Sequence, residues 1–235
     1  MIGTLYIVST PIGNLEDITY RAVRVLTEVS VIAAEDTRHT KTLLSHYQIH
    51  TPLTSYHDFN KEEKAAVLIA RLKEGNSIAL VSDAGTPTIS DPGYFLINQA
   101  ILAEIPISPI PGPSAVIAAL SVSGLPTDRF AFEGFMPRKK GARAKKLMAL
   151  QSDPRTLVFY ESPYRVLGLL EDIEAVFGKR RMTLCREMTK KFEEVMYGQI
   201  EEIIQKLGNK KLLGEFTVVV DGNSKKGVAT PQEDL

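Results

Sequence analysis

The most informative segment of this chain of 235 residues is Ser77-Ile78-Ala79-Leu80-Val81-Ser82-Asp83-Ala84-Gly85-Thr86-Pro87. Its first half, residues 77–81, is a continuous apolar run, which is typical of a strand buried on both faces of a sheet. Its second half begins a long loop, rich in Gly, Pro, Ser and Asp, that continues to Gly93. The stretch therefore predicts a buried strand followed by a ligand-binding loop with two carboxylates, Asp83 and Asp91.

Strands and helices alternate around this stretch. Short apolar runs at 4–9, 31–34 and 105–110 predict further strands, and amphipathic or capped segments at 19–29, 38–47, 61–74, 94–104 and 114–122 predict helices. This βαβ alternation predicts an α/β domain with a mainly parallel sheet.

The second half of the chain has a different pattern of predicted strands and helices. Strands are expected at 130–135, 156–160, 182–185, 194–197 and 215–221, and helices at 141–150, 163–177 and 200–207. We therefore predict two α/β domains, residues 1–125 and 126–223, followed by a flexible tail, residues 224–235.

The composition is that of an ordinary globular protein. With 44% hydrophobic and 24% charged residues it excludes disordered, collagenous and coiled-coil chains. No apolar run approaches the roughly 20 residues of a membrane-spanning helix, and the N-terminus lacks the basic region of a signal peptide. Cys185 is expected to be a thiol in the core, and because it is the one cysteine, an internal disulfide framework is excluded. We expect a cytoplasmic protein with no membrane partner and no metal.

The zero net charge hides an asymmetry between the two halves. Residues 1–129 hold 9 basic and 13 acidic side chains, whereas residues 130–235 hold 19 and 15. A basic run without acidic residues suits the phosphate backbone of a nucleic acid, although a solvated helix face is the alternative. The run consists of Arg138, Lys139, Lys140, Arg143, Lys145 and Lys146.

Three turns follow predicted parallel strands. They are Thr10-Pro11-Ile12-Gly13-Asn14, the loop that begins at Ser82, and Pro111-Gly112-Pro113-Ser114-Ala115. Because the carboxyl ends of parallel strands share one edge of a sheet, these turns should converge on a small-molecule site. Neither a G-x-G-x-x-G nor a P-loop spacing is present, so NAD and ATP are not favoured.

Acid–base candidates follow the predicted strand at 31–34. In Glu35-Asp36-Thr37-Arg38-His39, Asp36 and Arg38 suit proton transfer or phosphate contact, but an N-capping Asp36 beside a surface Arg38 is equally compatible with the pattern. The pair His57-Asp58, after Tyr56, is placed similarly and is less specific.

Six ordered segments together resemble the tetrapyrrole-methylase superfamily of S-adenosylmethionine-dependent methyltransferases. The resemblance covers about residues 3–221 and is closest to the branch that methylates ribosomal RNA. Its segments are Thr10-Pro11-Ile12-Gly13-Asn14-Leu15, Glu35-Asp36-Thr37-Arg38, Val81-Ser82-Asp83-Ala84-Gly85-Thr86-Pro87, Pro111-Gly112-Pro113-Ser114-Ala115, Phe159-Tyr160-Glu161-Ser162-Pro163 and Arg186-Glu187-Met188-Thr189-Lys190.

The resemblance implies a cofactor cleft between the two α/β domains, in a homodimer. The residues it assigns to S-adenosylmethionine are Pro11, Asp83, Ala84, Gly85, Thr86, Ile89, Ser114, Ala115, Tyr160 and Met188. The chain departs from porphyrin-type members at Pro11-Ile12-Gly13, where they carry Gly-Pro-Gly, and at Gly85-Thr86-Pro87, where they carry Gly-Asp-Pro. Both departures agree with the RNA branch.

That branch implies 2′-O-methylation of a cytidine in the decoding region of small-subunit (16S) rRNA, with free rRNA or the assembled subunit as partner. A ribose hydroxyl needs help to lose its proton, and Asp36, Arg38 and Asp83, with His57, are the catalytic candidates. The basic run would guide the RNA. Three alternatives stay open: a C-methylase of a tetrapyrrole or corrin precursor, a diphthine synthase-like protein methylase, and a non-catalytic module that binds the cofactor or RNA.

Overall fold

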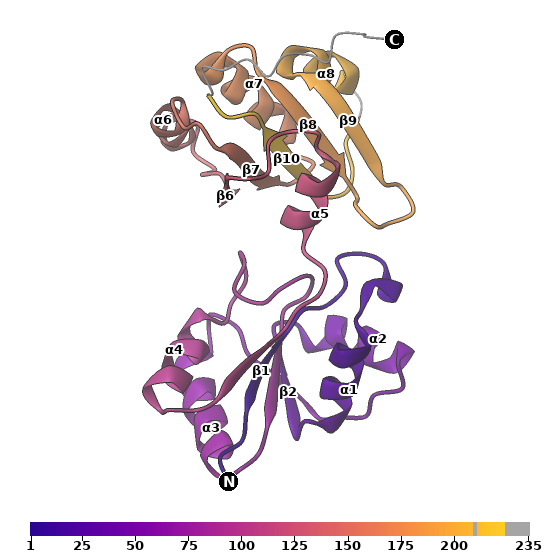
Figure 1. The fold of residues 1–235 in the computed structure, drawn as a ribbon, viewed down its shortest axis with the longest axis vertical. Helices are drawn as coiled ribbons and strands as arrows, with labels where there is room; N and C mark the ends of the chain where they lie inside the picture. The colour runs from indigo at the N-terminus through magenta and orange to yellow at the C-terminus, as the bar shows by residue number, and fades with distance from the viewer. Residues whose placement is uncertain (209–210, 224–235) are drawn as a thin grey trace. The chain divides into compact units, whose positions relative to one another are not determined.

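The computed structural model describes residues 1–208 and 211–223. The chain divides into two compact units, of which the first is Met1–Ala115 and the second begins at Val116. Figure 1 shows the helices and strands of each unit. The predicted tail, residues 224–235, lies outside the described residues.

The first unit is built on a five-stranded sheet in the order β3-β2-β4-β1-β5. Every neighbouring pair runs parallel, which confirms the predicted parallel sheet. All four residues of the central β4 are buried, as its unbroken apolar sequence predicted. The strands are β1 (Leu5–Val8), β2 (Val31–Ala34), β3 (Leu53–Ser55), β4 (Ile78–Val81) and β5 (Ile107–Ile110).

Helices cover both faces of this sheet (Figure 1). α1 (Tyr20–Glu28) and α2 (Thr37–His46) pack on one face, in a core that includes Val81. α3 (Lys61–Lys73) and α4 (Tyr94–Leu102) pack on the other, in a core that includes Leu80. Successive strand residues thus enter opposite cores, and the short 3-10 helix η1 (Leu15–Asp17) precedes α1.

The second unit contains a mixed five-stranded sheet in the order β6-β7-β10-β8-β9. Only β6 and β7 pair in parallel, and the other neighbouring pairs are antiparallel. Each predicted strand is present. They are β6 (Phe130–Phe135), β7 (Thr156–Glu161), β8 (Arg181–Arg186), β9 (Glu194–Gln199) and β10 (Phe216–Val220).

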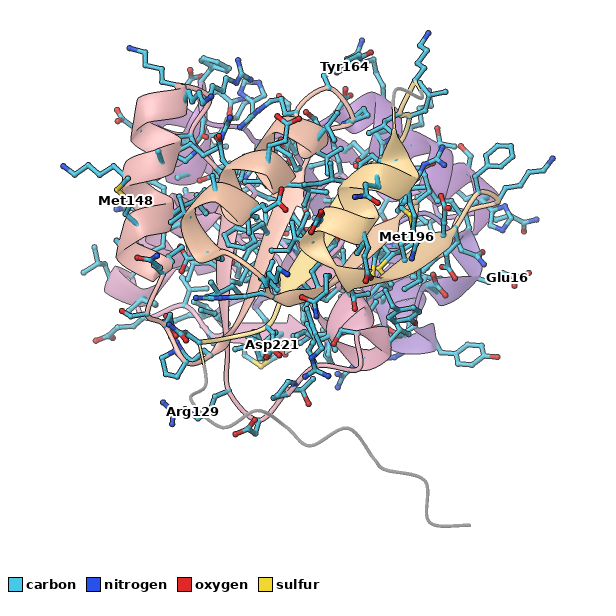
Figure 2. The ribbon with its side chains drawn as sticks, turned by 90° about the horizontal axis from the view of Figure 1, so that it is seen from above. Glu16, Arg129, Met148, Tyr164, Met196 and Asp221 are labelled. Carbon is cyan, nitrogen blue, oxygen red and sulfur yellow. The ribbon has the colours of Figure 1, made fainter. Side chains whose placement is uncertain are left out.

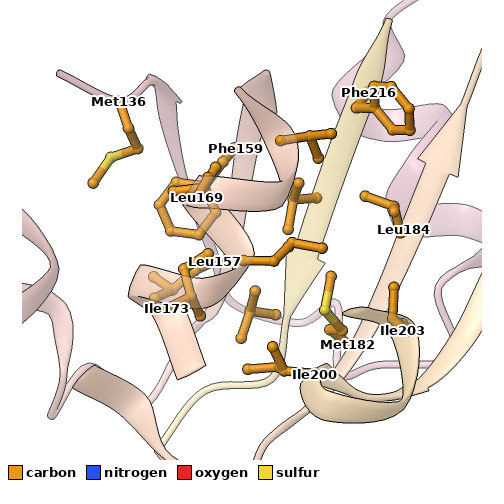
Figure 3. Close-up of a cluster of buried hydrophobic side chains, with 14 of the residues drawn as sticks. Met136, Leu157, Phe159, Leu169, Ile173, Met182, Leu184, Ile200, Ile203 and Phe216 are labelled. Carbon is orange, nitrogen blue, oxygen red and sulfur yellow. The ribbon is translucent and has the colours of Figure 1, made fainter. Parts of the chain in front are cut away.

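One face of this sheet carries the core drawn in Figure 3, where Leu157, Phe159 and Leu184 from the strands meet Leu169 and Ile203 from the helices. The helix predicted at 163–177 is present and buries one apolar face, which consists of Val166, Leu169, Leu170, Ile173 and Phe177. The helices are α6 (Lys140–Leu150), α7 (Val166–Phe177) and α8 (Ile200–Leu207). No helix within the described residues is long and apolar enough to cross a membrane.

Helix α5 (Ala115–Val122) covers the other face of the second sheet. Its apolar residues join a core with Val158, Cys185 and Val219, and the Thr183 hydroxyl donates to the Ser123 carbonyl at 2.7 Å. The first unit therefore ends at Ala115, earlier than the predicted boundary at 125, because α5 packs with the second sheet. Cys185 is fully buried, which raises the pKa of its thiol to about 12 and confirms a core role.

Candidate functional site

Two of the predicted turns are joined at the carboxyl edge of the first sheet. Thr10 and Gly85 exchange two backbone hydrogen bonds, of 2.9 and 3.0 Å, between the loops that follow β1 and β4. Next to them the hydroxyl oxygens of Ser9 and Thr86 lie 2.8 Å apart in a hydrogen bond. These bonds fasten the long loop to the first turn, as expected for neighbouring parallel strands.

The third turn approaches the same place. A Cβ atom at Gly112 would lie 3.0 Å from the Ser9 Cβ, so only glycine allows this closeness without movement. The Pro113 carbonyl likewise lies within van der Waals distance of a Cβ built on Gly85. The structure thus brings together the three turns whose convergence the sequence predicted, and Ser114 and Ala115 follow directly.

The loop from Ser82 to Gly93 is strained. Thr88 and Ser90 have φ angles of +77° and +67°, a region that side chains with a Cβ seldom adopt. In the second unit Glu187 and Thr189 are also left-handed, at +49° and +66°. Such strain costs on the order of 1–3 kcal/mol per residue and collects at ligand-binding sites. The first loop begins in the segment Val81–Pro87 and the second lies in Arg186–Lys190, two of the segments that carry the family resemblance.

Gly93 ends the first strained loop and begins α4, at a φ of +141°. We predict that Gly93→Ala lowers the free energy of unfolding by at least about 2 kcal/mol, because the backbone is strained and a Cβ would clash. That Cβ would lie 2.9 Å from Thr88 Cγ2 and 3.0 Å from Leu80 Cδ2. The measurement is denaturant unfolding, with Gly141→Ala as control, since nothing lies within 4 Å of a Cβ there.

Carboxylates gather at the same edge of the sheet. Burial raises the pKa of Glu35 to about 7, helped by the charges of Asp91, Asp83 and Asp58 and opposed by the Asp83 backbone N–H, which donates to it. Burial also raises the pKa of Asp91, which the Ser82 hydroxyl partly offsets by hydrogen bonding. These two half-buried carboxyls therefore retain protons more readily than exposed ones do.

Asp36 and Arg38, by contrast, form an ion pair with each other. The Asp36 carboxylate accepts the Arg38 backbone N–H at 2.8 Å and pairs with its guanidinium at 2.7 Å, which keeps the pKa of Asp36 well below its usual range. The Arg38 side chain is 90% exposed. Asp36 is thus the N-cap of α2 beside a surface arginine, which is the second of the two predicted possibilities.

Asp83 links the strands that carry these groups. Its Oδ1 accepts the Asp36 backbone N–H at 3.0 Å, which ties the β4 loop to the end of β2. His57 follows β3, its Nδ1 is buried without a partner among the described residues, and its ring meets Phe59 edge-on at 6.0 Å.

A small hollow opens beside Asp83. The Thr40 residue is 3% exposed, and its hydroxyl has no hydrogen-bond partner within the part of the chain that the structure describes. An unpaired buried hydroxyl is costly, so this position suits a polar ligand or a water molecule. The hollow is lined by Thr10, Pro11, Leu15, His39, Thr40, Leu43, Ser82 and Asp83.

The predicted cofactor residues fall in both units. Pro11 and Gly85 are buried in the joined loops, Thr86 is half-buried, and Ala84 and Ile89 are exposed. In the second unit the Tyr160 ring lies 4.8 Å from that of Phe132, and Met188 packs against the α5 core. A cleft shared by the two sets stays a prediction.

The six residues of the basic run separate into two kinds. Arg143 pairs with Asp172 at 2.6 Å and Lys146 with Glu133 at 3.1 Å, so these two hold the unit together. The other four are exposed and form no ion pair with any described residue: Arg138, Lys139, Lys140 and Lys145. Met148 on the same helix points away from the unit, which marks its outward face (Figure 2).

The chain thus has a parallel α/β unit followed by a mixed α/β unit, and the loops at the carboxyl edge of the first sheet are strained and hydrogen-bonded to each other. Open parallel α/β sheets commonly bind ligands at that edge, so the architecture is typical of a two-domain α/β enzyme. The model of the tetrapyrrole (corrin/porphyrin) methylases matches residues 4–204. The chain belongs to this family.

Individual relatives agree with this assignment. The chain is 51% identical over 224 residues to ribosomal RNA small subunit methyltransferase I of Halalkalibacterium halodurans, covering 95% of this chain and 78% of the relative. The structure of uroporphyrin-III-C-methyltransferase from Thermus thermophilus matches with a TM-score of 0.65 and 25% identity over 94% of each chain. A complex of a Thermus thermophilus uroporphyrin-III C-methyl transferase with S-adenyl homocysteine matches with a TM-score of 0.62 at 19% identity, over 92% of this chain and 97% of that one.

Proposed function

We propose that the chain transfers a methyl group from S-adenosylmethionine to the ribose 2′-hydroxyl of a cytidine in the decoding region of small-subunit rRNA. The observation that carries this proposal is the 51% identity, over nearly the whole chain, to a relative named for small-subunit rRNA methylation. The exposed, unpaired cations of the second unit favour RNA over a small macrocycle, because they suit an extended phosphate backbone.

The residues at the carboxyl edge fit this cofactor. Its methionine end carries a sulfonium and an ammonium group, and Asp83 with its carboxylate neighbours offers negative charge to cations. Gly85, at a φ of +76°, lets the loop backbone approach a ligand closely. The cofactor, when bound, supplies an electrophilic methyl group on sulfur. The proposed contacts are Pro11, Asp83, Ala84, Gly85, Thr86, Ile89, Ser114, Ala115, Tyr160 and Met188.

The chain's own contribution is to align and activate the acceptor. Methyl transfer is an in-line displacement, and the acceptor oxygen has to be held about 3–3.5 Å from the methyl carbon. Asp36 is a poor base because its pKa is well below the usual range, and Arg38 stays protonated. We therefore assign Arg38 to phosphate contact and Asp36 to holding it, while Asp83 fixes the loop beside the cofactor.

The proposed RNA surface consists of the four cations without ion pairs. Lys139 and Lys140 begin α6, where no acidic residue occupies the first turn and no side chain caps the helix. Positive side chains at a helix N-terminus are unfavourable in isolation, and a bound phosphate would offset that cost. The segment just before α6 is held by Arg165, which donates a hydrogen bond to the Met136 carbonyl. Arg165 is itself held by an ion pair with the buried Glu161.

We further propose a homodimer that acts in the cytoplasm, where small ribosomal subunits are assembled. Helix α4 supports the homodimer because apolar side chains of this helix face outward: Tyr94 is 77% exposed, Ile101 59% and Leu102 77%. Exposed apolar side chains gathered on one element are typical of protein interfaces.

The test is transfer of a labelled methyl group to small ribosomal subunits, and to their free rRNA, from a strain that lacks the modification. We expect label in 2′-O-methylcytidine after nucleoside analysis, and no label in subunits that already carry the methyl group. Label in a tetrapyrrole and none in RNA would favour the C-methylase alternative. Cofactor binding by calorimetry without transfer to any acceptor would indicate a binding module.

A further inference from the structure

We propose that Glu35 is the catalytic base of this reaction, whose carboxylate accepts the proton of the acceptor hydroxyl. The inference rests on the proposed function and names a residue that the sequence did not single out. Glu35 is part of the segment Glu35-Asp36-Thr37-Arg38, within which the pattern favoured Asp36 and Arg38.

The backbone holds Glu35 at the site. It directly follows β2, which lies beside β4 in the sheet, and the Asp83 backbone N–H donates to its carboxylate. Asp83 in turn accepts the Asp36 N–H at 3.0 Å, so the ends of β2 and β4 are locked together. No ion pair within the described residues engages Glu35. A carboxylate with this one backbone donor keeps capacity to accept a hydrogen bond from a substrate hydroxyl.

The adjoining hollow gives an independent indication of a polar ligand. Asp83 lines it, and so does Thr40, whose buried hydroxyl has no partner among the described residues. An oxygen-bearing group placed there would satisfy this hydroxyl. Glu35 does not itself line this hollow, but its carboxylate accepts a hydrogen bond from the backbone N–H of Asp83, which does.

The electrostatic surroundings suit proton transfer. The charges that act on Glu35 come from Asp83 and Asp91 on the loop after β4 and from Asp58 on the loop after β3, and all are carboxylates. With burial they raise the pKa of Glu35 to about 7, so that about half of the molecules carry the ionised form at pH 7. A general base works best when its pKa is near the working pH, which Asp36 does not offer.

The step is balanced in atoms and charge. The hydroxyl oxygen gives its proton to the Glu35 carboxylate as it bonds to the methyl carbon. The carbon–sulfur bond breaks and its electron pair returns to sulfur, which becomes a neutral thioether. Glu35, now neutral, then releases the proton to water.

The first experiment compares Glu35→Gln with the wild-type protein in methyl transfer to small ribosomal subunits. We expect kcat to fall by about 10²–10⁴-fold, with KM for the subunit within a few-fold, and the acid limb of the wild-type pH profile near pH 7 to disappear. Asp58→Asn is the matched control, because it removes one of the carboxylates that act on Glu35. It should keep the maximal rate and move the acid limb to slightly lower pH.

The second experiment needs no RNA. Binding of cationic S-adenosylmethionine should lower the pKa of Glu35 and release up to about half a proton at pH 7, measured by calorimetry in buffers of different ionisation enthalpy. Glu35→Gln should bind with little of this release.

The outcomes separate the two proposals. If the wild-type protein methylates RNA and Glu35→Gln keeps its rate, pH profile and proton release, the base assignment is wrong and the function stands. If the wild-type protein transfers no methyl group to RNA, the proposed function falls and the assignment of a base for it falls too.

Discussion

Arg143→Met is expected to lower the free energy of unfolding of the second unit by about 3–5 kcal/mol. The Arg143 Nε lies 2.6 Å from the Asp172 Oδ2, and the two side chains are only 11% and 13% exposed. The pair joins α6 to α7 and is largely shielded from solvent. Removal of the arginine therefore leaves the Asp172 carboxylate buried without a cation. Denaturant unfolding followed by circular dichroism measures the change.

Two further variants test the cause of this loss. Lys145→Met, on the same helix, is expected to change the free energy of unfolding by no more than about 0.5 kcal/mol, because Lys145 is exposed and has no ion pair among the described residues. The double variant Arg143→Met with Asp172→Leu should recover most of the lost stability, since it buries no lone charge. A double variant as unstable as Arg143→Met alone would show that the ion pair is not the source.

The difference between Arg143 and its neighbours in α6 was not predictable from the sequence. The run from Arg138 to Lys146 was predicted as one basic surface, because all six residues carry the same charge and nothing acidic intervenes. The partner of Arg143 lies 29 residues further along the chain, on another helix. Charge and spacing along α6 alone do not reveal this partner, so structural and RNA-binding cations look alike in the sequence.

The fold was easier to predict than the site. Unbroken apolar runs and helical periodicity depend on neighbours in sequence, and all α-helices and every strand except the short β3 (Leu53–Ser55) were predicted from them. The raised pKa of Glu35 depends first on burial and then on the charges of Asp91 and Asp83, and these surroundings form only when β2 and β4 pair. The predicted boundary at 125 differs from the division after Ala115 for a similar reason, because the sequence of α5 does not reveal which sheet its apolar residues contact, and in the structure they pack on the second.

Arg138→Glu together with Lys140→Glu is expected to weaken RNA binding on the order of 100-fold at moderate salt. Each cation that contacts a phosphate releases counterions, so loss of two contacts should make the plot of log affinity against log salt concentration shallower by about 2. Both side chains are exposed, so the free energy of unfolding should stay nearly constant. The measurement is anisotropy of a labelled decoding-region RNA over a salt series.

The same charge change elsewhere provides the control. Arg71→Glu with Lys73→Glu alters two exposed cations in the last turn of α3, at the end of that helix remote from the carboxyl edge of the sheet. If the proposed surface is correct, this control keeps most of the RNA affinity and the steep salt dependence, because a general change in net charge acts weakly through screened solvent. Equal losses in both double variants would show that RNA responds to net charge and not to the start of α6. A parallel loss of S-adenosylmethionine affinity in Arg138→Glu with Lys140→Glu would instead indicate misfolding.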